Sequence, residues 1–357
     1  MSPRSTRVAP VGFAEVPDFH VAVARRAQPE LANGPLIVGG DPAKRGRVVG
    51  LTSDLRALGV EEGMGVAEAL VRAPSARWLR TDMQRAREMS GQLRAAVRRE
   101  IGAVETSGLA AFYFRAPSDP GEARTLGEHL VALVGSETGL ALRAGIAPAR
   151  FAASLVAEDV GERGVAVLTP EAFEEFLLVL RVERLPAVGP KTTTRLLELG
   201  VQTVSGLREL GAERLELLLG SAGRSLWLLA GGEDPKPLRV RRHPMTLSRE
   251  EKLVGSEAGS AAREAVIARL STRLEKALRR DGLWAGRIAL RLTSADARSL
   301  TRSRSLWPPA ISAADIAAAA RDLLERAEAD QGSIRRIGIV LKGLEIAGAE
   351  DRQLDLF

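Results

Sequence analysis

The stretch formed by residues 185–210 limits the possible folds of this chain more than any other part of it. An apolar turn, Leu-Pro-Ala-Val-Gly, leads into Pro190, and proline suits the first position of a helix because its missing N–H has no intrahelical partner there. Gly200 is placed to end that helix, and the residues after it predict a second one. The amides of the turn and the charge of Lys191 predict a binding site for one phosphate of a nucleic-acid backbone. The residues expected to contact this phosphate are Val188, Gly189, Lys191 and Thr192, and an ordinary corner between two helices is the alternative.

The composition is that of a globular protein, and its basic balance indicates either an acidic partner or a basic genome-wide composition. The 357 residues are 45% hydrophobic and 27% charged, which allows two or three domains with cores, and the net charge is +6. There is no cysteine, and the histidines are far apart in sequence, which argues against a zinc cluster. No metal site and no cofactor is predicted. Because no apolar run reaches membrane-spanning length and the N-terminus lacks the core of a signal peptide, the sequence predicts a cytoplasmic protein with no membrane partner.

The first half of the chain predicts an α/β domain. Residues 81–101 predict a long amphipathic helix capped by Thr81 or Asp82, and the uncharged run 109–114 predicts a strand at the centre of a sheet. The strands and helices that follow, up to residue 168, indicate helices packed on a mixed sheet.

The second half predicts a helical part and then another mixed domain. Residues 170–232 predict only helices. A connector at 235–244, rich in arginine and proline, marks a domain boundary. The last domain has the order β-α-β-β-α-β, which is typical of a split βαβ, ferredoxin-like unit.

Basic residues of the connector and of the last domain predict a surface for DNA. Arg287 and Arg291 lie an even number of residues apart on a predicted strand, so they project from the same face. Such a face fits along a phosphate backbone, where contacts position the protein without recognising a sequence. For any single arginine, a solvated charged face is the alternative. The residues predicted to contact DNA here are Arg239, Arg241, Arg242, Arg287, Arg291, Thr301, Arg302 and Ser303.

The C-terminal residues 353–357 read Gln-Leu-Asp-Leu-Phe and resemble the bacterial sliding-clamp binding peptide, Gln-Leu-x-Leu-Phe. An extended peptide of this kind inserts apolar side chains into a pocket while an amide forms hydrogen bonds at the rim. The residues predicted to bind the clamp are Gln353, Leu354, Leu356 and Phe357. The alternative is that the terminal Leu-Phe packs on its own domain.

The order of these parts resembles the family Y (DinB/UmuC-type) translesion DNA polymerases. The segments that carry the resemblance are residues 26–40, 145–148, 185–210, 301–303 and 334–339. The resemblance implies a multidomain α/β (α+β) fold with palm, fingers, a helical thumb with a helix–hairpin–helix, and a little finger. The implied boundaries are 1–25 for the start of the palm, 26–78 for the fingers, 79–168 for the palm, 169–234 for the thumb, 235–244 for the linker, 245–345 for the little finger and 346–357 for the tail.

The family's metal-binding residues are replaced in this chain. Nucleotidyl transfer uses two metal ions held by carboxylates, which the family supplies from an Asp-x-Asp pair and from a Ser-Leu-Asp-Glu strand. The first pair aligns with Glu15 and Pro17, and the Asp-Glu pair aligns with Ala110 and Ala111. The family's other nucleotide-contacting positions align with His20, Ser53, Arg56 and Gly161, of which only Arg56 is kept.

These replacements predict a protein that is not an enzyme, similar to the ImuB-type adaptors of mutagenic translesion synthesis. The resemblance implies primer–template DNA, the sliding clamp, a replicative-type error-prone polymerase and a RecA-like accessory protein as partners, and a location at the nucleoid. A second hypothesis is a weak or unconventional polymerase, with Glu15, Asp18 and Glu105 as candidates for a rebuilt metal site. A third is a protein that binds DNA and the clamp and limits the access of other polymerases.

Overall fold

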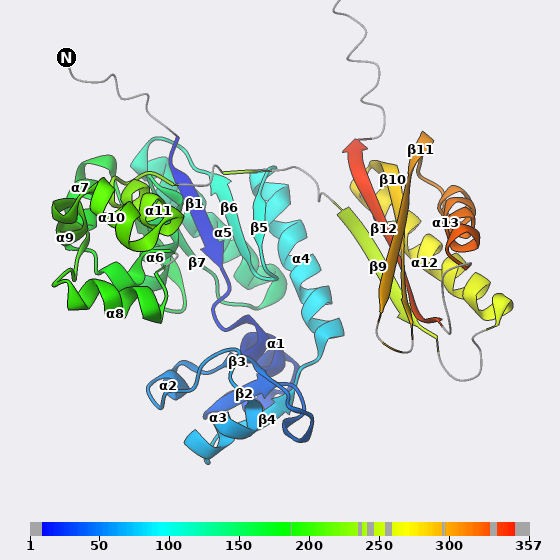
Figure 1. Ribbon diagram of the computed structural model, residues 1–357, viewed down its shortest axis with the longest axis horizontal. Helices are drawn as coiled ribbons and strands as arrows, with labels where there is room; N and C mark the ends of the chain where they lie inside the picture. Colours follow the sequence, from blue (N-terminus) through cyan, green and yellow to red (C-terminus); the bar gives the residue numbers. More distant parts are fainter. Residues whose placement is uncertain are drawn as a thin grey trace, which may run out of the picture. The chain divides into compact units, whose positions relative to one another are not determined.

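The computed structural model describes residues 9–186, 188–234, 238–240, 246–253, 259–294, 296, 298–328 and 334–346. Its contacts divide the chain into two units, Met1–Arg242 and His243–Phe357 (Figure 1). Among the described helices, none is both long and apolar enough to cross a membrane.

A five-stranded sheet, here called the palm sheet, lies at the centre of the first unit in the order β5-β6-β1-β7-β8 (Figure 1). β1 is antiparallel to both β6 and β7, while β7 is parallel to β8. The sheet is therefore mixed, as the sequence predicts. The strands are β1 Val11–Glu15, β5 Glu105–Ser107, β6 Ala111–Arg115, β7 Arg143–Ala147 and β8 Gly164–Val167.

Two long helices cover one face of the palm sheet. α4 (Met83–Ile101) and α5 (Pro120–Thr138) pack against the face that carries Phe112 and Phe114. The predicted helix start is confirmed, because the Asp82 side chain accepts a hydrogen bond from the amide of Arg85 at 3.0 Å.

A shorter helix, α6 (Arg150–Asp159), covers part of the opposite face at β7. The two backbones approach closely at Gly145, where an added Cβ would lie 2.1 Å from the carbonyl oxygen of Ala153. Glycine is needed at this position because no side chain fits between the strand and the helix.

A small sheet in the order β3-β2-β4 and short helices form the part predicted as the fingers. Its core contains Ile37, Leu51 and Leu55, all at most 1% exposed. The elements are α1 Phe19–Ala27, η1 Pro29–Leu31, β2 Leu36–Gly39, η2 Pro42–Lys44, β3 Val48–Leu51, α2 Ser53–Arg56, α3 Val66–Arg72 and β4 Arg77–Arg80.

Helices form the part predicted as the thumb. Pro190 begins α8, as the sequence predicts, and Leu196 on its inner side is buried with Val204 and Leu207 of the next helix. The elements are α7 Pro170–Val179, η3 Val182–Arg184, α8 Pro190–Glu198, α9 Val204–Leu210, α10 Ala212–Leu219 and α11 Ser221–Ala230.

The second unit has the predicted order β-α-β-β-α-β, with the four strands in one antiparallel sheet ordered β11-β10-β12-β9. One face of this sheet carries Ile288, Leu290 and Leu292, which pack in one core with both helices. The elements are β9 Thr246–Lys252, α12 Ser260–Asp281, β10 Leu283–Ser294, β11 Ser299–Ala310, α13 Ala313–Glu328 and β12 Ile334–Ile346.

Candidate nucleic-acid interface and the palm sheet

The face of the second unit's sheet that points away from its helices, here called the outer face, carries mostly basic and hydroxyl side chains. Because Ile288, Leu290 and Leu292 point into the core, Arg287 and Arg291 point to the outer face. The cross-strand register then assigns the remaining members. The outer face carries the basic residues Lys252, Arg287, Arg291, Arg336 and Lys342, the hydroxyl residues Thr246, Ser248, Thr293, Ser299, Thr301, Ser303 and Ser305, the carboxylates of Glu250 and Glu345, and the small or apolar residues Trp284, Ala289, Gly338 and Val340.

The charge of the outer face is positive. Within the described strands its carboxylates are Glu250, which Arg336 neutralises at 3.0 Å, and Glu345, which pairs with Trp284 near the end of β12. Arg287 and Arg291 are exposed, and no carboxylate of the described residues forms an ion pair with either. Ala289 lies between them on the same face and is only 1% exposed. The two arginines therefore flank a small, buried side chain.

The structure separates Arg302 from the two hydroxyl residues beside it. Thr301 and Ser303 pair with Arg291 and Ala289 on the outer face, whereas Arg302 pairs with Leu290 and so lies on the helix-covered side. Arg304 lies on that side too and binds Asp322 of α13 at 2.6 Å, which lowers the pKa of the Asp322 carboxyl. The sequence identified the basic strand, but not which of its residues share a face with Arg287.

Three basic residues of the outer face were not predicted. Arg336 and Lys342 lie on β12, opposite Thr293 and Arg287 of β10, and Lys252 lies on β9 opposite Arg336. The alternation in residues 334–341 indicates a strand, but only the register between strands shows that these charges join Arg287 and Arg291.

The thumb hairpin presents backbone amides as the sequence predicts. Gly189 precedes α8 in an extended conformation, with φ −91° and ψ 175°. The amide of Thr193 donates to the carbonyl of Gly189 at 2.9 Å, whereas the first-turn amides of Lys191 and Thr192 have no hydrogen bond among the described residues. Lys191 is exposed beside them, and Val188 packs on the thumb core. These groups therefore leave a small positive site at the start of the helix.

The linker is only partly described. The Arg239 amide donates to Glu105 at 2.6 Å, and Glu105 also binds Arg150 at 2.7 Å. The Arg150 guanidinium in turn lies 3.9 Å from the centre of the Tyr113 ring. Arg241, Arg242 and the predicted clamp-binding residues Gln353, Leu354, Leu356 and Phe357 lie outside the described residues.

Glu15 lies at the end of β1, between Ala111 of β6 and Arg143 of β7. The Arg143 Nη2 donates to Glu15 Oε1 at 2.5 Å and its Nε donates to the same atom at 2.9 Å. Ala110 faces the core beneath α4, and Ala111 packs on the opposite side. Pro17 follows at the end of the strand, before α1.

The palm sheet as described does not fit two divalent cations. Cations of this kind take oxygen ligands, whereas positions 110 and 111 offer only methyl groups. The carboxylates suggested for a rebuilt site are all engaged by arginines, Glu15 by Arg143, Asp18 by Arg56 and Glu105 by Arg150. No group of three or more His, Asp or Glu residues in the described part of the chain is placed to hold a metal ion.

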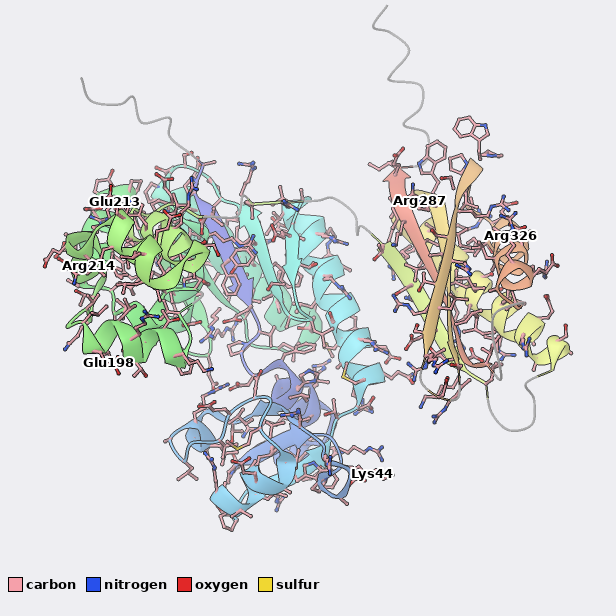
Figure 2. All side chains as sticks on the ribbon, in the orientation of Figure 1. Lys44, Glu198, Glu213, Arg214, Arg287 and Arg326 are labelled. Carbon is pink, nitrogen blue, oxygen red and sulfur yellow. The ribbon has the colours of Figure 1, made fainter. Side chains whose placement is uncertain are left out.

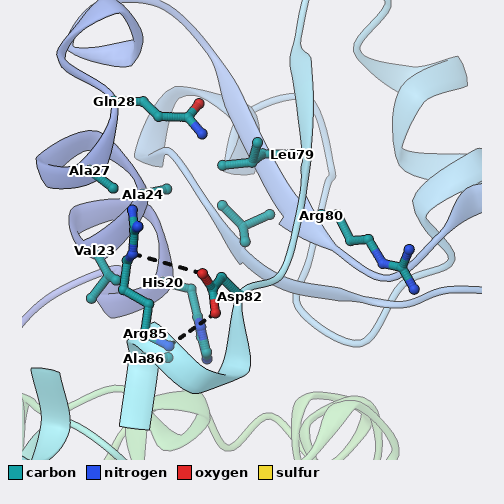
Figure 3. A pocket seen from close by; sticks show the side chains of 11 residues that line it. His20, Val23, Ala24, Ala27, Gln28, Leu79, Arg80, Asp82, Arg85 and Ala86 are labelled. Atoms are coloured by element: carbon teal, nitrogen blue, oxygen red, sulfur yellow. Dashed lines mark hydrogen bonds and ion pairs between the residues drawn. The ribbon is translucent and has the colours of Figure 1, made fainter. Parts of the chain in front are cut away.

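His20 lines a pocket of about 260 Å³ between α1, β4 and the start of α4 (Figure 3). Burial lowers the pKa of His20, which favours the neutral imidazole. Asp82 and Arg85 lie beside it, held together by the capping hydrogen bond of α4.

Two family models match the chain, the impB/mucB/samB family at residues 15–158 and the C-terminal domain of the same family at residues 247–356. A DNA polymerase IV from Alkalilimnicola ehrlichii is 31% identical over 343 residues, which cover 95% of this chain and 96% of that protein. The chain belongs to the Y-family, DinB/UmuC-type DNA polymerase homologues. A DNA polymerase IV from Halorhodospira halophila, 30% identical over 95% of both chains, is a second relative.

Solved structures show the same fold over most of the chain. DinB from Sulfolobus solfataricus has a TM-score of 0.73 at 20% identity, covering 94% of this chain and 99% of the other. An insertion ternary complex of Dbh DNA polymerase has a TM-score of 0.72 with the same identity and coverage. The predicted fold class is therefore confirmed.

The prediction that this chain is not an enzyme is wrong. It rested on the methyl groups of Ala110 and Ala111, and it treated the loss of two aligned carboxylates as the loss of activity. The matched relatives are named DNA polymerase IV and align over nearly the full length of both chains, which points to an enzyme. The narrower resemblance to ImuB-type adaptors stays a prediction.

Proposed function

We propose that this Y-family chain is a translesion DNA polymerase that binds primer–template DNA without sequence preference. The observation that supports the proposal most is the outer face, where basic and hydroxyl side chains surround a centre of small and apolar residues. Hydroxyl and guanidinium groups are donors to phosphate oxygens, and such contacts position a protein on DNA without reading bases.

The spacing of the arginines fits a phosphate backbone. Arg287 and Arg291 are four residues apart on β10, which corresponds to about 13 Å along a strand. One DNA strand advances about 3.4 Å per nucleotide along the helix axis. With β10 running along the duplex, the two side chains therefore match phosphates about four nucleotides apart.

The thumb hairpin supplies a second point of contact in this proposal. The amides of Lys191 and Thr192, which have no hydrogen bond to the part of the chain that the structure describes, and the Lys191 ammonium suit a single phosphate. A protein that holds DNA at two separate places gains affinity from both contacts without any base recognition.

Nucleotidyl transfer is expected to be slow in this polymerase. A cation at Glu15 competes with the Arg143 guanidinium, and Ala110 and Ala111 add no oxygen ligand. The relatives' name supports activity, while the side chains of the palm sheet support a low rate.

Fluorescence anisotropy with two primer–templates of unrelated sequence tests the DNA-binding part of the proposal. We expect equal dissociation constants for the two, and the logarithm of each affinity should fall linearly with the logarithm of the salt concentration. A tenfold preference for one sequence, or an affinity that ignores salt, would contradict sequence-independent backbone binding.

Docking on the sliding clamp is the second part of the proposed function. Its support is the match of residues 353–357 to the clamp-binding peptide. A chain docked in this way also places a second polymerase or a RecA-like accessory protein within reach, which is the role that the resemblance to ImuB-type adaptors implies. A pull-down with the tagged chain from cells after DNA damage tests for these partners, and a variant that lacks residues 353–357 is the control.

A further inference from the structure

All three nitrogens of the Arg143 guanidinium donate to acceptors, which lie at the end of β1 and at the end of α6. Its Nε and Nη2 both donate to Glu15 Oε1, at 2.9 and 2.5 Å. Its Nη1 reaches the carbonyl oxygens of Gly161 at 3.2 Å and of Glu158 at 3.4 Å. Both side chains of the pair are about one-fifth exposed, 18% for Arg143 and 22% for Glu15, so the pair is only partly screened by water.

The strand register brings Glu15 and Arg143 together. Glu15 and Arg143 are direct cross-strand partners on β1 and β7, and Ala111 is the direct partner of Glu15 on β6. Direct partners of an antiparallel pair have Cβ atoms about 4.5–5.5 Å apart, which is close enough for their side chains to interact. Glu15 thus has a cation on one side and a methyl group on the other.

We propose that Arg143 takes the place of a divalent cation at Glu15 and is the residue that keeps metal affinity low in this palm sheet. The inference rests on the proposed function, for which such a cation is the expected cofactor. A cation approaching Glu15 meets a fixed positive charge and a carboxylate oxygen that already accepts two N–H groups. Like charges at this separation disfavour each other strongly when water is partly excluded.

The test measures Mn²⁺ binding to the full chain without DNA, by electron paramagnetic resonance of the free ion. In Arg143→Gln we expect affinity for one Mn²⁺ to rise about tenfold or more, because one positive charge is removed from contact with Glu15. In Arg143→Lys, which keeps the charge, we expect a much smaller rise. Arg143→Met, which keeps the apolar stem, provides a second neutral variant if glutamine lowers stability.

Arg184→Gln is the matched control. It removes the same charge from the same neighbourhood, since Arg184 binds Asp159 at 2.7 Å, but it does not touch Glu15. We expect no rise in Mn²⁺ affinity in this variant. The rise in Mn²⁺ affinity of Arg143→Gln should disappear when Glu15→Gln is added. Unchanged Mn²⁺ affinity in folded Arg143 variants, or a gain that survives Glu15→Gln, overturns the proposal.

The unaltered chain supplies a measurement that needs no stable variant. Mn²⁺ broadens the NMR signal of a nearby N–H group, so the Arg143 Nε–H signal reports a metal at Glu15. We expect it to stay sharp at Mn²⁺ concentrations that bind the chain elsewhere, and selective broadening refutes the inference. Neither result depends on DNA binding or on primer extension, so failure of the inference is distinguishable from failure of the proposed function.

Discussion

Replacing both Arg287 and Arg291 by glutamine is expected to weaken the binding of primer–template DNA about 60-fold at 0.1 M monovalent salt. Each phosphate contact to duplex DNA contributes about 0.9 to the slope of log affinity against log salt. At 0.1 M this corresponds to about 0.9 decades of affinity per contact, and two contacts give about 1.8 decades, or about 2.4 kcal/mol. The slope itself should become shallower by about 1.8.

The assay is fluorescence anisotropy with a labelled primer–template at four or more salt concentrations. The matched control is Arg279→Gln with Arg326→Gln, which removes the same charge from α12 and α13, the helices that pack on the other side of the sheet. Figure 2 labels Arg326 and Arg287. We expect the control to keep its slope and to lose little affinity. Equal losses in the two double variants would show that only net charge matters, and would refute the placement of DNA on the outer face.

Three further predictions concern packing, pH and the tail. Gly145→Ala should lower the free energy of unfolding by about 1–3 kcal/mol, because its Cβ would meet the Ala153 carbonyl, whereas Gly91→Ala in open space should not lower it; urea unfolding measures both. Because burial lowers the pKa of His20 in the folded chain, the unfolded chain binds more protons below about pH 6.5, and stability should fall as the pH drops there. In thermal unfolding, the melting temperature of His20→Gln should depend less on pH than that of the unaltered chain. Leu356→Ala with Phe357→Ala should abolish calorimetric binding to the sliding clamp, since each buried side chain contributes about 1.5–3 kcal/mol, and unchanged binding would exclude the tail.

Local patterns predicted the elements that carry this fold. Pro190 begins a helix, because its ring and its missing N–H suit that position and few others. Asp82 starts α4, and the β-α-β-β-α-β order of the second unit follows from alternation and helical periodicity. These features depend on neighbours within a few residues, which a sequence displays directly.

Features that depend on register could not be predicted in this way. Arg302 was grouped with Thr301 and Ser303, but alternation along β11 turns it to the other side of the sheet. Arg143 carries no motif, and it meets Glu15 only because β7 pairs with β1 residue for residue. Ala110 and Ala111 led to the wrong prediction about activity, because two positions carry less information than similarity over 95% of the chain to a DNA polymerase IV.

Primer extension by the purified full chain tests the central claim, that this Y-family protein is a translesion DNA polymerase. The substrate is a primer–template with an abasic site in the template, the ion is Mn²⁺ or Mg²⁺, and Glu15→Gln is the control. We expect slow extension by the unaltered chain and a clear loss in Glu15→Gln, with DNA affinity the same in both. Absence of product from a chain that binds the primer–template with full affinity would contradict it.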